Sequence, residues 1–168
     1  MLRVKKIVSG GQTGADRAAL DFAIEHGIPH GGWCPKGRLS EDGIIEKRYQ
    51  LRETSTKNYP QRTEKNVQEA EGTVIFTIAP KLTGGSKKTA QLADKNNKPW
   101  LHISRCGGAY SKEDQLVRFI AENSIRTLNI AGSRASKEPQ VYDFVKQTLE
   151  NALFPRPAAA WIGGPGEG

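Results

Sequence analysis

Cysteine, histidine and long apolar runs are scarce in this sequence. Its 168 residues include two cysteines, Cys34 and Cys106, which lie far apart and form no Cys-x-x-Cys pair. The histidines His26, His30 and His102 show no metal-ligand spacing, which favours ordinary structural roles. No apolar stretch approaches the roughly 20 residues of a membrane span. We therefore expect a cytoplasmic protein with reduced thiols, no signal peptide, no bound metal and no contact with a membrane.

The charge balance is basic, with 25 Lys and Arg against 18 Asp and Glu, a net charge of +7. The cations are scattered, and no run of five is interleaved with aromatic residues, so nucleic-acid binding is disfavoured. Small phosphorylated or oxyanionic ligands would suit this net charge equally well. The length predicts a single ligand-binding domain over residues 1–154. Residues 155–168, rich in Pro, Ala and Gly, are expected to be a flexible tail.

Strand-like and helix-like segments alternate along the chain. Apolar runs predict buried strands, and amphipathic stretches predict helices. The expected strands cover residues 4–8, 72–80, 99–104 and 127–131, and the expected helices begin near residues 17, 59, 90, 112 and 138. Residues 41–58 are expected to be a long surface excursion. This alternation predicts an α/β domain with a mostly parallel sheet.

The first strand leads into the glycine-rich stretch at residues 9–16. Glycines let the backbone approach a ligand, and the free amides of a following helix favour anions. Thr13 and Asp16 also fit a capping box with Thr13 as N-cap, so a well-capped helix without a ligand is the alternative. No lysine follows Gly14, as a P-loop requires, and the dinucleotide motif Gly-x-Gly-x-x-Gly is incomplete.

The same order of strand, small polar loop and helix occurs twice more. The second loop contains Thr83, Gly84, Gly85 and Ser86, with Thr89 one turn later. The third contains Gly132, Ser133 and Arg134, and Ser136 is expected to cap the last helix. Because parallel strands end at one edge of a sheet, the three loops should form a single basic pocket there.

Other residues could complete such a pocket. Trp33 offers a flat face for a ring, and Lys36 offers a cation for a phosphate. Arg62 and Asn66 share one face of their helix. The alternatives are that Trp33 and Cys34 simply pack under their loop and that the charge of Arg62 is solvated.

The segments Gly10–Asp21 and Gly31–Arg38 together resemble the molybdenum carrier protein family. The second and third loops support this resemblance, which covers roughly residues 4–153. It implies a Rossmann-like three-layer sandwich related to the superfamily of LOG enzymes and the DNA-processing protein DprA. It also implies a homo-oligomer that binds and protects the molybdenum cofactor (molybdopterin) or molybdate. Molybdoenzymes or cofactor-biosynthesis proteins would be its partners, and no side chain need ligate the metal.

The combined hypothesis is a carrier without catalytic residues or protein metal ligands. Its expected cofactor-binding residues are Gly10, Gly11, Gln12, Thr13, Gly14, Asp16, Trp33, Lys36, Arg62, Thr83, Gly84, Gly85, Ser86, Thr89, Gly132, Ser133 and Arg134.

The alternative function is a LOG-like phosphoribohydrolase that cleaves the N-glycosidic bond of a nucleoside monophosphate. Alignment of the LOG motif on Gly84 and Gly85 places Gln91 where that family has its glutamate. A neutral amide cannot act as a carboxylate acid or base. Asp16, Glu53 or Glu64 would have to supply the carboxylate instead. Whether a ligand is turned over stays open at this point.

Overall fold

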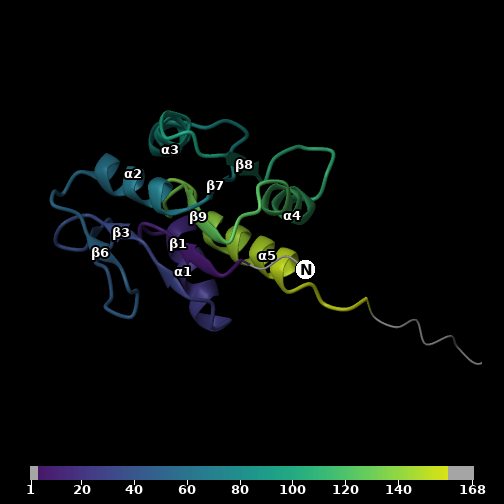
Figure 1. Ribbon diagram of the computed structural model, residues 1–168, viewed down its shortest axis with the longest axis horizontal. Coiled ribbons are helices and arrows are strands. Elements are labelled where there is room, and N and C mark those ends of the chain that lie inside the picture. Colours follow the sequence, from purple (N-terminus) through teal and green to yellow (C-terminus); the bar gives the residue numbers. More distant parts are fainter. Residues whose placement is uncertain (1–3, 159–168) are drawn as a thin grey trace, which may run out of the picture.

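A five-stranded parallel sheet forms the centre of the protein, described here from a computed structural model over residues 4–158 (Figure 1). Its strand order is β2-β1-β9-β7-β8, and every neighbouring pair is parallel. The strands are β1 (Lys6–Val8), β2 (His30–Gly31), β7 (Gly72–Thr77), β8 (Trp100–Ser104) and β9 (Thr127–Gly132). The last strand therefore lies in the middle of the sheet.

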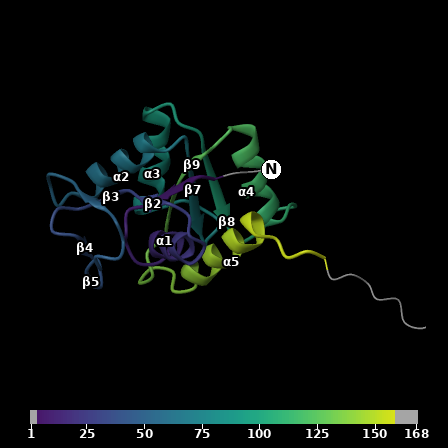
Figure 2. The same ribbon diagram turned by 60° about the horizontal axis from the view of Figure 1, so that its bottom comes forward.

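Helices cover both faces of this sheet (Figures 1 and 2). On one face, α1 (Ala15–Glu25) packs against α5 (Val141–Leu153), which also contacts α4 (Lys112–Glu122). On the other face, α2 (Tyr59–Glu69) packs against α3 (Gly84–Lys95). The predicted Rossmann-like α/β sandwich is confirmed.

The core lies where the central strands meet the helices. All six residues of β7 are buried, as its central run of Val, Ile and Phe predicts for a strand covered on both faces. Val74, Phe76, Leu128 and Ile130 belong to the same buried cluster as apolar residues of α1, α4 and α5. This packing fixes the strand ends, from which the loops of the candidate site emerge.

Several predicted boundaries differ from the structure. Strand β7 ends at Thr77 rather than at residue 80, and α1 begins two residues earlier than expected. Helix α3 begins at Gly84 rather than after Thr89, so most of the second glycine stretch is helical. The expected cap of the last helix is wrong, because α5 begins at Val141 and the Ser136 hydroxyl bonds Glu41 instead. The N-cap of α4 is Ser111, whose Oγ accepts a hydrogen bond of 3.0 Å from the Asp114 N–H.

The segment after β2 contains four short strands. Strands β3 (Trp33–Cys34) and β6 (Arg52–Glu53) pair in parallel, and β4 (Leu39–Ser40) and β5 (Gly43–Ile44) form a hairpin. The 41–58 excursion is not wholly a surface loop. Its Ile45 and Tyr49 are buried against Leu20 and Cys34 in a second, smaller core.

Two further expectations concern the C-terminal tail and the absence of a membrane-spanning helix. Most of the expected flexible tail, residues 159–168, lies outside the described residues. Within residues 4–158, no helix is long and apolar enough to cross a bilayer.

Candidate functional site

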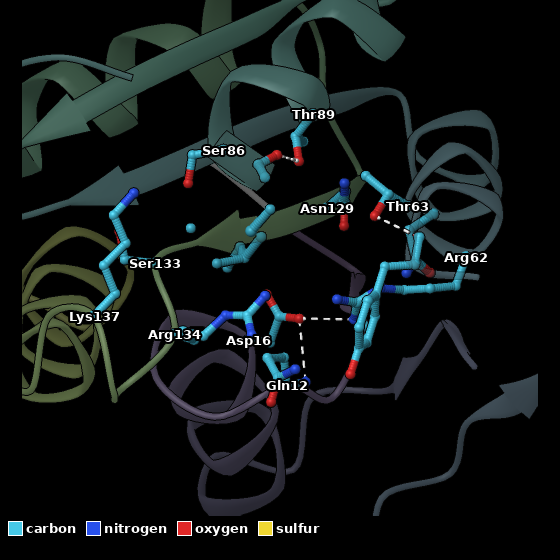
Figure 3. A pocket seen from close by; sticks show the side chains of 17 residues that line it. Gln12, Asp16, Arg62, Thr63, Ser86, Thr89, Asn129, Ser133, Arg134 and Lys137 are labelled. Atoms are coloured by element: carbon cyan, nitrogen blue, oxygen red, sulfur yellow. Dashed lines mark hydrogen bonds and ion pairs between the residues drawn. The ribbon is translucent and has the colours of Figure 1, made fainter. Parts of the chain in front are cut away.

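A cavity of about 120 Å³ opens at the carboxyl ends of the central strands (Figure 3). Residues 129–132 of β9 form part of its wall. The connection after β1 leads to β2 on one side of β9, and the connection after β7 leads to β8 on the other side. Ligands of open parallel sheets bind where the connections diverge in this way.

All three glycine loops contribute residues to this cavity. The expected site residues that line it are Gly10, Gln12, Asp16, Arg62, Gly85, Ser86, Thr89, Gly132, Ser133 and Arg134. The charged side chains in the lining are Arg62, Arg134, Lys137 and Asp16, which gives a formal charge of three minus one, or +2. The cavity therefore favours an anionic ligand.

The remaining expected residues lie outside the lining. They are Gly11, Thr13, Gly14, Trp33, Lys36, Thr83 and Gly84. Of these, Thr83 lines a small adjoining hollow that shares Ser86, Ser133 and Lys137 with the main cavity. Lys36 is exposed in the turn after β3.

The first turn of α3 is the part of the wall best suited to an anion. Its N-cap residue, Thr83, makes no side-chain cap bond, and the turn contains no acidic residue. Lys87 and Lys88 are in its sequence instead, although cations at a helix N-terminus oppose the macrodipole. Lys137 donates a hydrogen bond of 2.6 Å to the Thr83 Oγ1, which holds a further cation beside this turn. A bound anion would neutralise this concentration of positive charge.

The first turn of α1 is already occupied by protein groups. The N-cap is Gly14 and makes no side-chain cap bond, so the predicted Thr13 cap is wrong. The Thr13 hydroxyl instead bonds Glu41 and accepts a hydrogen bond of 3.1 Å from the Ala135 N–H. The first loop therefore closes against the third, and its helix amides are less available to a ligand.

Asp16 and Arg62 form an ion pair in the wall of the cavity. The Arg62 Nη1 donates to the Asp16 Oδ2 at 3.2 Å, and their side chains are 12% and 9% exposed. Burial raises the pKa of the Asp16 carboxyl, although Arg62 acts in the opposite direction. A Cβ atom at Gly10 would lie 1.8 Å from Arg62 Nη1, so only glycine leaves room for the guanidinium there.

The aromatic ring at the cavity belongs to Tyr59 rather than to Trp33. Tyr59 lines the cavity, and its ring centroid lies 5.4 Å from the Arg62 Cζ and 5.9 Å from the Arg134 Cζ. Trp33 lies outside, where the Lys65 Nζ is 4.4 Å from its ring centroid. The position of Tyr59 one turn before Arg62 and Thr63, on the same helix, was the signal that could have identified it.

Sequence reasoning also missed Lys137 and Asn129. Lys137 follows the third loop by three residues and lies at the cavity wall (Figure 3). Asn129 is a buried polar residue within β9, and its Nδ2 donates to the Thr73 Oγ1 at 3.1 Å. A polar residue in an otherwise apolar strand is a signal that could have marked the cavity wall.

The Glu41 carboxylate connects the two loops beside the cavity. It accepts hydrogen bonds from the Ser136 N–H at 3.1 Å and the Ser136 hydroxyl at 2.6 Å, and it also bonds the Thr13 hydroxyl. Although burial alone would raise it, the pKa of Glu41 is lowered by these hydrogen bonds and by Arg134. The β4–β5 hairpin thereby fixes one side of the site.

A family model matches residues 7–153, most of the chain. The chain belongs to the circularly permutated YpsA SLOG family. The strand order of this SLOG-family chain shows how such a permutation works. If the strands of the sheet are numbered from β7 onwards, passing from β9 to β1, their spatial order becomes 2-1-3-4-5, a common order of doubly wound sheets.

A solved structure supports the same assignment. The chain is 49% identical to a protein from Syntrophus aciditrophicus described as a putative molybdenum carrier protein, with a TM-score of 0.83. The match covers 89% of this chain and 95% of that one. The resemblance to molybdenum carrier proteins is therefore confirmed at the level of the family.

A second solved structure is only distantly similar to this chain. A solved structure of (E)-4-hydroxy-3-methyl-but-2-enyl diphosphate reductase matches with 10% identity and a TM-score of 0.40, over 86% of this chain and 59% of that one. That likeness carries no argument about function. The search of curated proteins gave no significant match.

Proposed function

We propose that the protein binds a small phosphorylated or oxyanionic ligand in the cavity of Figure 3. The observation that carries this proposal is the first turn of α3, which faces the cavity with two following lysines and no side-chain cap. Helix amides, hydroxyl groups and cations are the groups that proteins use to hold phosphate. The net positive charge of the lining supports the same ligand class.

The molybdenum cofactor is the leading candidate within this class. It combines a phosphate, a pterin ring and a molybdenum oxo group, and the cavity combines a cationic wall with the Tyr59 ring. Within residues 4–158, no group of three or more His, Cys, Asp and Glu residues is arranged to hold a metal. On this proposal the metal stays bound through the cofactor's own dithiolene, and the protein holds the surrounding groups.

The carrier role extends to storage and transfer. The similarity to a described molybdenum carrier supports a cytoplasmic protein that protects the cofactor without converting it. A homo-oligomer would shield the cofactor further, and molybdoenzymes or cofactor-biosynthesis proteins would be the exchange partners. These parts of the proposal rest on the family resemblance.

The alternative, a nucleotide phosphoribohydrolase, has one observation in its favour. Asp16 lines the cavity, and burial raises the pKa of its carboxyl, as is common for catalytic acids. Gln91, in contrast, is exposed on α3. Glu53 accepts a hydrogen bond from the Gly37 N–H, and Glu64 pairs with Lys95. Asp16 is therefore the carboxylate to test for hydrolysis.

A thermal-shift experiment tests the proposed function. The ligands are molybdate, tungstate, phosphate, AMP and, under anaerobic conditions, the isolated molybdenum cofactor. A ligand at a hundred times its dissociation constant adds about 2.7 kcal/mol to the free energy of unfolding. Lys137→Met should reduce this stabilisation, and Lys57→Met, an exposed lysine outside the cavity lining, is the matched control.

The outcomes separate the two functions. Stabilisation by the cofactor without consumption of any ligand supports a carrier. Release of adenine from AMP, lost in Asp16→Asn, would establish the hydrolase instead. If none of these anions stabilises the protein, the cavity is not an oxyanion site and the proposal fails.

A further inference from the structure

The two sides of the cavity differ in charge. On one side, Lys137 is an exposed cation beside the first turn of α3. On the other side, Arg62 pairs with Asp16, the Arg134 Nη1 lies 3.9 Å from the Glu41 Oε2, and Gln12 lies nearby (Figure 3). The net positive charge around the cavity therefore lies on the Lys137 side, and each cation of the other side faces a carboxylate.

The amide of Gln12 has a donor without a partner. Its Oε1 accepts hydrogen bonds from the Thr13 N–H and the Glu41 N–H, both at 3.0 Å. These two donors fix the orientation of the amide, because a flipped amide would turn its NH₂ group towards them. The Nε2 is buried and has no hydrogen-bond acceptor within residues 4–158. The residue as a whole is 6% exposed.

The guanidinium of Arg62 is also incompletely bonded. Among the described residues, its one side-chain hydrogen bond runs from Nη1 to Asp16, and its buried Nε has no acceptor. A guanidinium carries five N–H donors, and buried donors are normally paired. Gln12 and Arg62 both line the cavity, so the two residues that carry an unpaired donor belong to the same wall.

We infer that the ligand has two ends, an anionic group beside α3 and an uncharged hydrogen-bond acceptor, such as a carbonyl oxygen, that is held by Gln12 and Arg62. This inference rests on the proposed oxyanion site. The second group is uncharged because Asp16 already neutralises Arg62, and a second anion would be repelled by the Asp16 carboxylate. An acceptor oxygen supplies what the two unpaired donors lack.

Phosphonates of matched length test the inference. Three series with one to four methylene spacers are compared by calorimetry: alkylphosphonates with a methyl end, ketophosphonates with a methyl-ketone end and phosphonocarboxylates. At the best spacing, the ketone-ended compound should bind about tenfold more tightly than its methyl-ended counterpart. The carboxylate-ended compound should gain less than the ketone.

Two variants show which side of the cavity is responsible. Gln12→Glu keeps an acceptor for the Thr13 and Glu41 amides but removes the Nε2 donor. The ketone preference, which is the affinity of the ketone-ended compound divided by that of its methyl-ended counterpart, should therefore fall to about one. Lys137→Met should weaken all three series alike and leave the preference intact. Circular dichroism and the melting temperature confirm that each variant is folded before its affinity ratio is used.

The failures of the two proposals are distinguishable. If the phosphonates bind but the ketone gives no gain at any spacing, the two-ended ligand is wrong and the oxyanion site stands. If the carboxylate-ended compound gains as much affinity over the methyl-ended one as the ketone does, or more, the inference that the second end is uncharged is wrong. If Gln12→Glu keeps the full preference, the assigned residues are wrong. If no phosphonate binds, both proposals fail.

Discussion

The Ala15 N–H donates a hydrogen bond of 3.1 Å to the Ser133 carbonyl oxygen, which ties the first turn of α1 to the loop after β9. Gly14, directly before Ala15, has a positive φ of 80°. A Cβ atom there would lie 2.4 Å from the same Ser133 oxygen and 2.8 Å from the Ala135 nitrogen. The contact between the two loops therefore requires glycine at this position.

Gly14→Ala should destabilise the fold by about 3 kcal/mol, because backbone strain and a steric clash combine. The free energy of unfolding is measured with urea. Gly27→Ala is the matched control: it has a similar positive φ, 64°, but no atom within 4 Å of the new Cβ. That variant should lose only about 1 kcal/mol. Equal losses in the two variants would mean that the loop contact does not restrict Gly14.

Glu41→Gln should lower the stability by about 1 kcal/mol at pH 7, because charge-assisted hydrogen bonds become neutral ones. The folded pKa of Glu41 lies below its usual 4.5. Its contribution is therefore present above pH 4.5 and is lost as the pH falls through the folded pKa. Urea titrations of both proteins from pH 7 to pH 3 should show the difference shrinking. A difference that stays constant with pH would contradict this role.

Tyr59→Leu should weaken the binding of phenyl phosphate by about threefold to tenfold and leave the affinity for methyl phosphate almost unchanged. The reason is that Tyr59 lines the cavity, whereas Trp33 does not. Trp33→Leu is the control and should change neither affinity. Calorimetric titration of both esters gives the comparison. If the Trp33 variant loses affinity for phenyl phosphate and the Tyr59 variant does not, the ring lies where the sequence analysis expected it.

The two thiols should react at very different rates. Cys106 is exposed, whereas Cys34 has no exposed surface, and burial raises the pKa of its thiol. A thiol-disulfide reagent should therefore modify one cysteine rapidly in the native protein and the second only on unfolding. Cys106→Ser should abolish the rapid phase. Two rapid phases in the native protein would show that the core around Cys34 opens readily.

The sequence predicted the architecture well because its signals are local. A strand buried on both faces, such as β7, needs a continuous apolar run, and residues 74–76 at its centre provide one. Helix α2 begins at Tyr59, as expected, because Pro60 is favoured in the first turn of a helix. The order of the strands has no such local signal. That β9 lies between β1 and β7 depends on packing across the whole chain.

The site was predicted in outline, and its details depended on long-range contacts. The three loops do meet at one cavity, because parallel strands end at one edge of the sheet. Thr13 looked like a cap, but its hydroxyl is bonded to Glu41, 28 positions away in sequence. Trp33 and Lys36 are close in sequence to β2, yet Trp33 lies in the small β3–β6 sheet and Lys36 in the turn after β3, both outside the cavity lining. No pattern within a short stretch of the sequence indicates such contacts.

The central place of β9 has a consequence for synthesis on the ribosome. Strand β1 is made first, but its partner strand β9, which pairs with it through Lys6 and Thr127, is the last strand of the sheet to be made. Until β9 emerges, the halves of the sheet around β1 and β7 have no common neighbour, and the wall formed by residues 129–134 does not exist. A chain that stops before β9 therefore lacks the complete cavity, and the cavity forms only after β9 has been made.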